Sequence, residues 1–230
     1  MKCLGLIGGV SWESTREYYR LLNTEVRLRL GGLHSAHCLI YSVDFDPLER
    51  AMQMGDWKRI EKTILGAAQS LQGGGAEALL LGSNTLHLLA PEIQSKSSLP
   101  LLHIADAVGK SLQKEKRKKA LLLGTRLTME HGFYQEYLSK NYPMEIVTPE
   151  ENDRKLIHKA IFEELCLGIL KDSTRESFIR IIENNLFQQI DSVILGCTEI
   201  ENLLSPDQSP LPLFPTTALH VRAGIDWALN

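Results

Sequence analysis

The stretch Val193-Ile194-Leu195-Gly196-Cys197-Thr198-Glu199-Ile200 joins an apolar run, a glycine and a nucleophilic side chain. The branched apolar residues predict a short buried strand, and Gly196 lets the chain turn into a helix. Cys197 is therefore expected at the carboxyl end of a strand, where open α/β sheets bind their ligands. Because the free N–H groups of a helix N-terminus favour a thiolate, we also expect a lowered pKa for Cys197.

The same pattern occurs once more, in Leu79-Leu80-Leu81-Gly82-Ser83-Asn84-Thr85-Leu86, with Ser83 in the place of Cys197. The two turns are 114 residues apart, about half the chain. Two further pairs of segments match in the same order at nearly the same spacing: Leu6-Ile7-Gly8 with Leu122-Leu123-Gly124, and Leu99-Pro100-Leu101-Leu102 with Leu211-Pro212-Leu213-Phe214. Three ordered matches predict a chain made of two similar halves.

Strand-like and helical segments alternate in both halves, which predicts two α/β lobes, each a parallel sheet flanked by helices, with right-handed crossovers. The basic run Lys114–Lys119 marks the expected boundary, since such a charged run is typical of a solvated junction. We assign residues 1–115 to the first lobe and residues 118–215 to the second. Residues 216–230 are a candidate for completing the first lobe.

Composition argues against several classes of function. With 230 residues, 43% of them hydrophobic, the chain has enough apolar side chains for one large core or two smaller ones. The net charge of −3 argues against nucleic acid or an anionic membrane as a partner, and no apolar run approaches the ~20 residues of a membrane span. The first residues do not have the pattern of a signal peptide, and four cysteines without a C-x-x-C pair are typical of free thiols. These features predict a cytoplasmic protein.

A hydroxyl at one turn, Ser83, and a thiol at the equivalent turn, Cys197, suit proton transfer at a carbon atom. A pseudo-two-fold relation between the lobes would bring Ser83 and Cys197 to opposite sides of one ligand, in a cleft between them. Two acid/base groups on opposite faces of one carbon are what racemisation without a cofactor requires, and the pKa of a thiol can be tuned toward neutrality. The neighbouring polar groups would hold a substrate carboxylate at the helix N-termini. Nothing in the sequence predicts a metal site or a nucleotide-binding loop.

Four glycine-containing segments carry a family resemblance: Gly8-Gly9-Val10-Ser11-Trp12-Glu13-Ser14-Thr15, Gly82-Ser83-Asn84-Thr85, Gly124-Thr125-Arg126-Leu127-Thr128-Met129 and Gly196-Cys197-Thr198-Glu199. Together with Ile161-Phe162-Glu163-Glu164-Leu165-Cys166-Leu167-Gly168, they resemble the motifs of the aspartate/glutamate racemase superfamily over essentially the whole chain. The chain is most similar to the L-aspartate/glutamate-specific racemases of enteric bacteria. The resemblance implies an active site between two lobes, no pyridoxal phosphate or other cofactor, a small acidic amino acid as substrate, and a homodimer.

The motif positions imply a role for each candidate residue. Cys197 corresponds to a catalytic acid/base residue, and Ser83 occupies the second catalytic position. The residues implied to contact the substrate carboxylate are Asn84, Thr85, Thr125 and Thr198, and those implied to line the remainder of the cleft are Ser11 and Thr128. The sequence does not rank the arginines that would bind a side-chain carboxylate, which are Arg16, Arg50 and Arg126.

The chain departs from the family pattern at Ser83, because typical members carry cysteine at both turns. A hydroxyl is a much weaker acid and base than a thiol, so the pair favours a one-sided racemase that prefers one enantiomer, the L-form by resemblance. Two alternatives stay open: a single-thiol decarboxylase or isomerase of the same superfamily, and a protein that binds an acidic amino acid without converting it. The sequence also allows Ser83 to be a mere helix cap, and His87 to be either a packed side chain or one that tunes the site.

Overall fold

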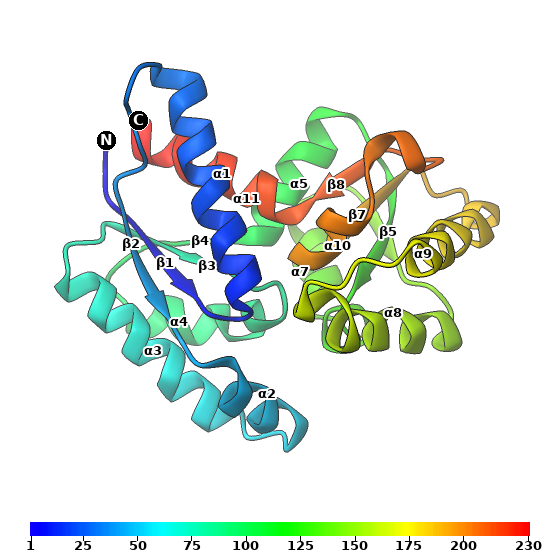
Figure 1. The fold of residues 1–230 in the computed structure, drawn as a ribbon, viewed down its shortest axis with the longest axis horizontal. Coiled ribbons are helices and arrows are strands. Elements are labelled where there is room, and N and C mark those ends of the chain that lie inside the picture. Colours follow the sequence, from blue (N-terminus) through cyan, green and yellow to red (C-terminus); the bar gives the residue numbers. More distant parts are fainter. The chain divides into compact units, whose positions relative to one another are not determined.

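Short runs of leucine, isoleucine and valine form the strands of two parallel sheets, one in each half of the chain (Figure 1). The computed structural model describes residues 1–230, which form two units: Met1–Ile104 with His220–Asn230, and Ala105–Leu219. The strand orders, β2-β1-β3-β4 and β6-β5-β7-β8, are equivalent. Every pair of neighbouring strands is parallel, which confirms the predicted fold of two similar α/β lobes.

The strands are short and end at corresponding points of the two halves. The first sheet contains β1 (Leu4–Gly8), β2 (Cys38–Ser42), β3 (Ala78–Leu81) and β4 (Leu101–Leu102). The second sheet contains β5 (Lys119–Gly124), β6 (Glu145–Val147), β7 (Ser192–Gly196) and β8 (Leu213–Pro215).

Helices connect successive strands, as parallel pairing requires. Those between the strands of the first sheet are α1 (Trp12–Leu30), α2 (Phe45–Gln53), α3 (Trp57–Gly73), the 3₁₀-helix η1 (Thr85–Leu89) and α4 (Ala90–Lys96). Those that follow are α5 (Ile104–Lys114), α6 (Arg126–Glu130), α7 (Phe133–Asn141), α8 (Glu151–Glu163), α9 (Asp172–Asn184) and α10 (Thr198–Leu203). Three short 3₁₀-helices lie in the second half, η2 (Leu165–Leu167), η3 (Leu186–Gln188) and η4 (Pro206–Gln208), and α11 (Thr216–Leu229) ends the chain.

Both faces of the first sheet are covered by helices. Ile7 and Leu81 belong to a buried cluster with residues of α2, α3 and α4. Leu6 and Leu80, which point to the opposite face, belong to a second cluster with residues of α1 and the C-terminal part of α11. The near-continuous apolar runs of β1 and β3 follow from this double covering.

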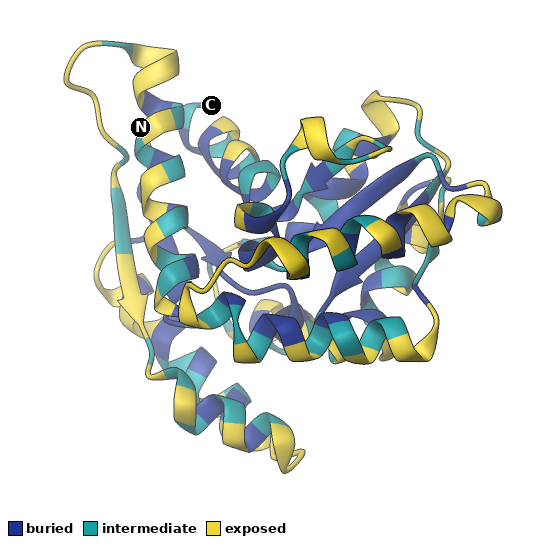
Figure 2. Cartoon of the chain, turned by 45° about the vertical axis from the view of Figure 1, so that its right-hand side comes forward, coloured by how far each residue is buried: buried dark blue, intermediate teal, exposed yellow.

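The second sheet is also buried on both faces. Leu121 and Leu195 pack with residues of α8 and α9 in one cluster. Their strand neighbours Leu122 and Ile194 are fully buried and point to the opposite face. Figure 2 shows β5 and β7 in dark blue, whereas α8 and α9 each expose one side to solvent.

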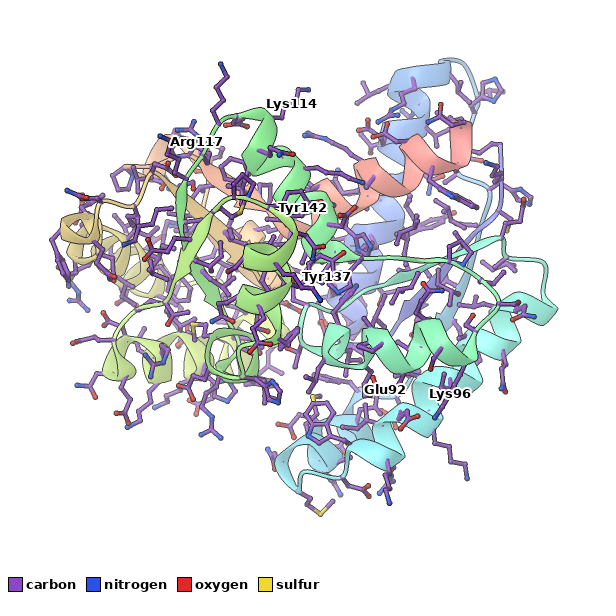
Figure 3. All side chains as sticks on the ribbon, turned by 180° about the vertical axis from the view of Figure 1, so that it is seen from behind. Glu92, Lys96, Lys114, Arg117, Tyr137 and Tyr142 are labelled. Carbon is purple, nitrogen blue, oxygen red and sulfur yellow. The ribbon has the colours of Figure 1, made fainter.

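The boundary between the units falls inside helices and not in the basic run near residue 115. From Ala105 onward, α5 belongs to the second unit because it docks against the chain that follows α7. The Tyr142 hydroxyl donates a hydrogen bond to the Asp106 carboxylate, and the Tyr142 ring lies against Gly109. Tyr142 is labelled in Figure 3. The basic run is instead the solvated connection from α5 to β5 within the second unit.

The chain returns to the first unit at His220, within α11. The Tyr18 hydroxyl and His220 Nδ1 are 2.8 Å apart, and Arg29 forms an ion pair with Asp226. Most of α11 is therefore part of the first lobe, as the sequence allows for residues 216–230. The second lobe thus contains α5, which follows the last strand of the first sheet. The first lobe contains most of α11, which follows the last strand of the second sheet.

Two helices differ from the prediction. The sequence predicts one helix up to about Lys140, but the structure contains α6 and α7, separated by Gly132 with a φ of 90°. That left-handed conformation cannot continue an α-helix. Helix α2 is not predicted because it spans only nine residues and contains Pro47, which its first turn tolerates. A membrane-spanning segment needs a long apolar helix, and the structure contains none.

Replacing Gly109 by alanine tests how α5 is held. A Cβ atom there would lie 2.3 Å from the Tyr142 ring, so we expect the free energy of unfolding to fall by about 1–3 kcal/mol. Gly66 is the matched control, because it also lies inside a helix and its Cβ would meet nothing within 4 Å. Gly66→Ala should raise the stability by up to about 1 kcal/mol. Urea unfolding followed by circular dichroism measures both, and equal effects would contradict the docking of α5 against Tyr142.

Candidate active site

In both sheets the strand order changes direction at the two central strands. The chain passes from β1 to β2 on one side and then to β3 on the other, and β5, β6 and β7 repeat this arrangement. Open α/β sheets bind ligands at such a switch point, next to the carboxyl ends of the central strands. The residues that directly follow β1, β3, β5 and β7 are therefore the first candidates for a site.

In the second unit, β5 and β7 end side by side, with Gly124 opposite Gly196. A Cβ atom at Gly124 would lie 3.0 Å from the Gly196 carbonyl oxygen, and one at Gly196 would lie 2.9 Å from the Leu123 carbonyl oxygen. This close approach of the two backbones requires glycine at both positions. Thr125 and Cys197, the next residues, consequently lie at the same edge of the sheet.

Thr125 is the N-cap residue of α6. Its Oγ1 accepts a hydrogen bond from the Thr128 N–H at 3.3 Å and lies 3.1 Å from the Thr128 hydroxyl oxygen. Thr128 is completely buried, and Thr198, the first residue of α10, is buried as well. The second unit thus brings four predicted site residues to one edge of its sheet: Thr125, Thr128, Cys197 and Thr198.

The first unit repeats the arrangement, because Ile7 of β1 pairs with Leu81 of β3. Ser11 follows β1 as the N-cap residue of α1, and its Oγ accepts a hydrogen bond from the Ser14 N–H at 3.3 Å. Ser11 is buried, with 6% of its surface exposed. Its place corresponds to that of Thr125 in the second unit.

Ser83 lies two residues after β3 and is buried. Its Oγ accepts a hydrogen bond from the Leu86 N–H at 3.3 Å, as a helix-capping serine does. The serine therefore does act as a cap, and the bond leaves its O–H group available as a donor. Asn84 and Thr85 are buried at the same end of the strand. The first unit thus groups Ser11, Ser83, Asn84 and Thr85.

Cys197 lies at the N-cap position of α10 and is half-buried. Its thiol donates a hydrogen bond to the buried Glu199 carboxylate, with Sγ and Oε2 2.9 Å apart. Desolvation and the negative charge of Glu199 raise the pKa of Cys197 well above that of a free thiol. The expectation of a lowered pKa is therefore wrong, and the thiol is protonated at neutral pH.

Opposing effects of the same residue explain this correction. The Glu199 N–H at the start of α10 lowers the pKa of Cys197, as a helix N-terminus should, but desolvation and the Glu199 carboxylate have larger effects. A helix N-terminus contributes only about 0.3–1 kcal/mol at an accessible site, and α10 has six residues. Burial and the Glu199 carboxylate thus keep the thiol protonated, and that carboxylate is placed to accept the thiol proton.

The arginines considered for a second substrate carboxylate each have a partner. Arg16 lies over the Trp12 ring, Arg50 is 2.9 Å from the Asp46 carboxylate, and Arg126 is 4.0 Å from the Glu130 carboxylate. Arg126 directly follows Thr125, and its side chain is 66% exposed. It is therefore the best placed of the three to bind an anion. No group of three or more His, Cys, Asp or Glu side chains is arranged to hold a metal ion.

Two residues of this region have no settled role from the sequence. Glu199 is a carboxylate two residues after the thiol, and this spacing is the signal that could have identified it. His87 lies four residues after Ser83, and its ring bonds to the Ser83 carbonyl oxygen. A helical turn places residues four apart on one face, so this contact also has a signal in the sequence.

Comparisons with known proteins agree with these observations. The family model for Asp/Glu/hydantoin racemases matches residues 7–224. RacX from Bacillus subtilis (strain 168), a broad specificity amino-acid racemase, is 26% identical over 170 residues, which cover 71% of this chain and 70% of RacX. The structure of a candidate Asp/Glu racemase from Yersinia pestis is similar with a TM-score of 0.92 and 44% identity. That of an aspartate racemase homologue from Pyrococcus horikoshii OT3 has a TM-score of 0.85 and 31% identity, and both comparisons cover 100% of each chain.

Replacing Glu199 by glutamine removes the negative charge beside the thiol. We expect the pKa of Cys197 to fall and its alkylation by iodoacetamide near neutral pH to become roughly 10-fold faster, since one pKa unit changes the thiolate fraction about tenfold. Mass spectrometry of the peptide that contains Cys197 gives the rate. Glu176→Gln, at an exposed position of α9, is the control and should leave the rate unchanged. Slower alkylation of the Glu199→Gln variant would contradict a thiol that Glu199 keeps protonated.

Proposed function

The chain belongs to the Asp/Glu/hydantoin racemase family and is an amino-acid racemase, and from this premise we propose that it interconverts the enantiomers of aspartate or glutamate. In this proposal Cys197 is the only thiol acid/base, Ser83 stands at the second catalytic position, and no cofactor takes part. The choice of substrates rests on the family description and on the names of the Yersinia and Pyrococcus relatives.

The contrast between the two equivalent turns carries this proposal. They follow β3 and β7, which have the same place in two sheets of the same order. At the second turn, a thiol donates to a buried carboxylate, which makes an acid/base pair. At the first turn, the Ser83 hydroxyl caps a helix, and the nearby His87 ring bonds to backbone groups. Only the second turn pairs its acid/base side chain with a carboxylate that accepts its proton, so we expect proton transfer to be faster there than at the Ser83 turn.

The proposed reaction begins with the thiol proton. Glu199 accepts this proton from Cys197 Sγ, and the resulting thiolate removes the α-proton of the amino acid, so the sulfur again carries a proton. The carbanion then receives a proton on its other face, from the Ser83 hydroxyl or from a water molecule bound to it. Solvent restores the proton on the Ser83 side and takes up the proton that Glu199 accepted. In the reverse direction the Cys197 thiol is the proton donor.

Polar groups at helix starts are proposed to hold the substrate. The backbone N–H groups and side chains there supply several hydrogen-bond donors for the α-carboxylate, and the same donors stabilise negative charge that spreads from the carbanion. The proposed binding residues are Asn84 and Thr85 near the start of η1, Thr125 and Thr198 at the starts of α6 and α10, and Ser11 and Thr128 beside them. Arg126 is proposed for the side-chain carboxylate, because it directly follows Thr125 at the start of α6.

Incubation of each enantiomer of aspartate and of glutamate in deuterated water tests this proposal. We expect fast α-deuterium incorporation for one enantiomer, the L-form, because Cys197 reaches the α-proton from one face only. Inversion needs delivery of a proton from the Ser83 side and should be at least about 10-fold slower than exchange, since positioned acids and bases contribute about 10²–10⁴-fold. Proton NMR measures the exchange, and chiral chromatography measures the inversion.

Substitutions at the two turns extend this test. Cys197→Ser should abolish both exchange and inversion, whereas Ser83→Cys should speed inversion and make the two enantiomers exchange more equally. Equal exchange of both enantiomers that survives Cys197→Ser would overturn the single-thiol mechanism. Release of carbon dioxide without exchange, or binding of the amino acid without any reaction, would overturn the proposed reaction itself.

A further inference from the structure

His87 connects the Ser83 turn to the point where the chain leaves the first lobe. The His87 ring is buried, with Nδ1 2.8 Å from the Ser83 carbonyl oxygen and Nε2 3.2 Å from the Ile104 nitrogen. Ile104 is the first residue of α5 and the last residue of the N-terminal part of the first unit. One side chain thus bridges the backbones of Ser83 and Ile104, which are 21 residues apart in sequence.

The two backbone partners determine the protonation of the ring. The Ile104 N–H can only donate, so Nε2 must accept with its lone pair. The Ser83 carbonyl oxygen can only accept, so Nδ1 must carry the proton. His87 is therefore a neutral imidazole in one fixed tautomer. A second proton on Nε2 would face the Ile104 N–H and break that contact.

Neighbouring rings favour the same neutral state. The rings of His103 and His220 lie 4.6 and 5.8 Å from that of His87, measured between centroids. Burial, followed by these two histidines, holds the pKa of His87 well below its usual value. His220 is itself engaged, because its Nε2 donates to the Leu102 carbonyl oxygen at 2.6 Å and its Nδ1 accepts from the Tyr18 hydroxyl at 2.8 Å. Burial lowers the pKa of His220 to about 4.

The two hydrogen bonds of His87 pair backbone groups, the Ser83 carbonyl and the Ile104 N–H, that need a partner. The first N–H groups of a helix lack partners within the helix, and the Ile104 N–H is one of these. The Ser83 carbonyl belongs to a buried residue, where an unpaired carbonyl costs free energy. Because the ring joins both groups, it limits the positions that the Ser83 peptide can take. The Ser83 hydroxyl is fixed in addition by the Leu86 N–H.

We propose that His87 is a positioning residue for the Ser83 side of the reaction, which holds the Ser83 turn through its Nδ1–H and anchors that turn to Ile104 through Nε2. The inference rests on the proposed function of Ser83. Both ring nitrogens are bonded to backbone groups, so His87 does not exchange protons with the Ser83 hydroxyl in this arrangement. It acts by fixing where that hydroxyl points.

The proposal predicts a specific loss of inversion. The Cys197 side of the reaction lies on the other lobe and does not depend on His87, so α-deuterium exchange should remain. Inversion depends on the Ser83 side, and a displacement of about 1 Å at a reacting group can cost roughly 10²-fold. We therefore use the ratio of inversion to exchange for the L-enantiomer as the readout, because a general loss of folded protein lowers both rates and leaves their ratio unchanged.

Three substitutions separate the two bonds. His87→Leu removes both, and should lower the ratio roughly 10²-fold while exchange changes by less than about 3-fold. His87→Asn places an amide donor near the position of Nδ1 and should restore the ratio to within about 10-fold of the unaltered protein. His87→Gln places its amide near the position of Nε2 instead and should resemble His87→Leu. His34→Asn, at an exposed histidine of the same unit, is the control and should change neither rate.

The outcomes distinguish this inference from the function on which it rests. Absence of exchange in the unaltered protein would overturn the proposed function. Exchange in the unaltered protein with an unchanged ratio in His87→Leu would overturn only the role of His87. If His87→Leu does not fold, as urea unfolding will show, the Asn and Gln variants decide the question. Equal ratios in these two variants would contradict positioning through the Ser83 carbonyl.

Discussion

Parallel pairing of the central strands, β1 with β3 and β5 with β7, controls where the reactive side chains of this protein lie. A parallel strand cannot be followed by a tight hairpin, so each strand leads into a helix that starts at the same edge of its sheet. Polar residues directly after these strands therefore gather at one edge and begin helices. The contact of Gly124 with Gly196 shows how closely two such ends approach, since neither position has room for a Cβ atom. The backbone of each turn is set by this pairing, while the side chain at positions 83 and 197 is not.

The two lobes use this shared backbone in different ways. At Cys197, burial and a carboxylate on the same helix keep the free thiol protonated, and that carboxylate is a proton acceptor at hydrogen-bond distance. At Ser83, the nearby titratable side chain is a histidine whose two nitrogens both serve backbone groups, so it contributes order and not acidity. The duplicated fold therefore supplies equivalent positions, but the partners of each position decide which one transfers protons readily.

Much of the fold follows from local pattern in the sequence. The three repeated segments predict two equivalent sheets, and the structure contains them. The boundary between the lobes does not follow, because it depends on the packing of Tyr142 against α5 and not on the solvated basic run. The motif around Cys197 correctly places the thiol at the start of a helix. Its charge state depends on the direction of the Glu199 side chain, which spacing alone does not determine.

Each half of the chain contributes a terminal helix to the unit formed by the other half. Helix α5 follows the first sheet in the chain, but nearly all of it belongs to the second lobe. Helix α11 follows the second sheet, but most of it belongs to the first lobe. Two separate half-length chains would make these contacts by swapping their last helices, so the chain has the connectivity of a domain-swapped dimer joined end to end. Only a short junction, Lys114–Lys119, joins the two halves between α5 and β5. Because one chain carries both halves, their sequences can differ at equivalent positions, as Ser83 and Cys197 do.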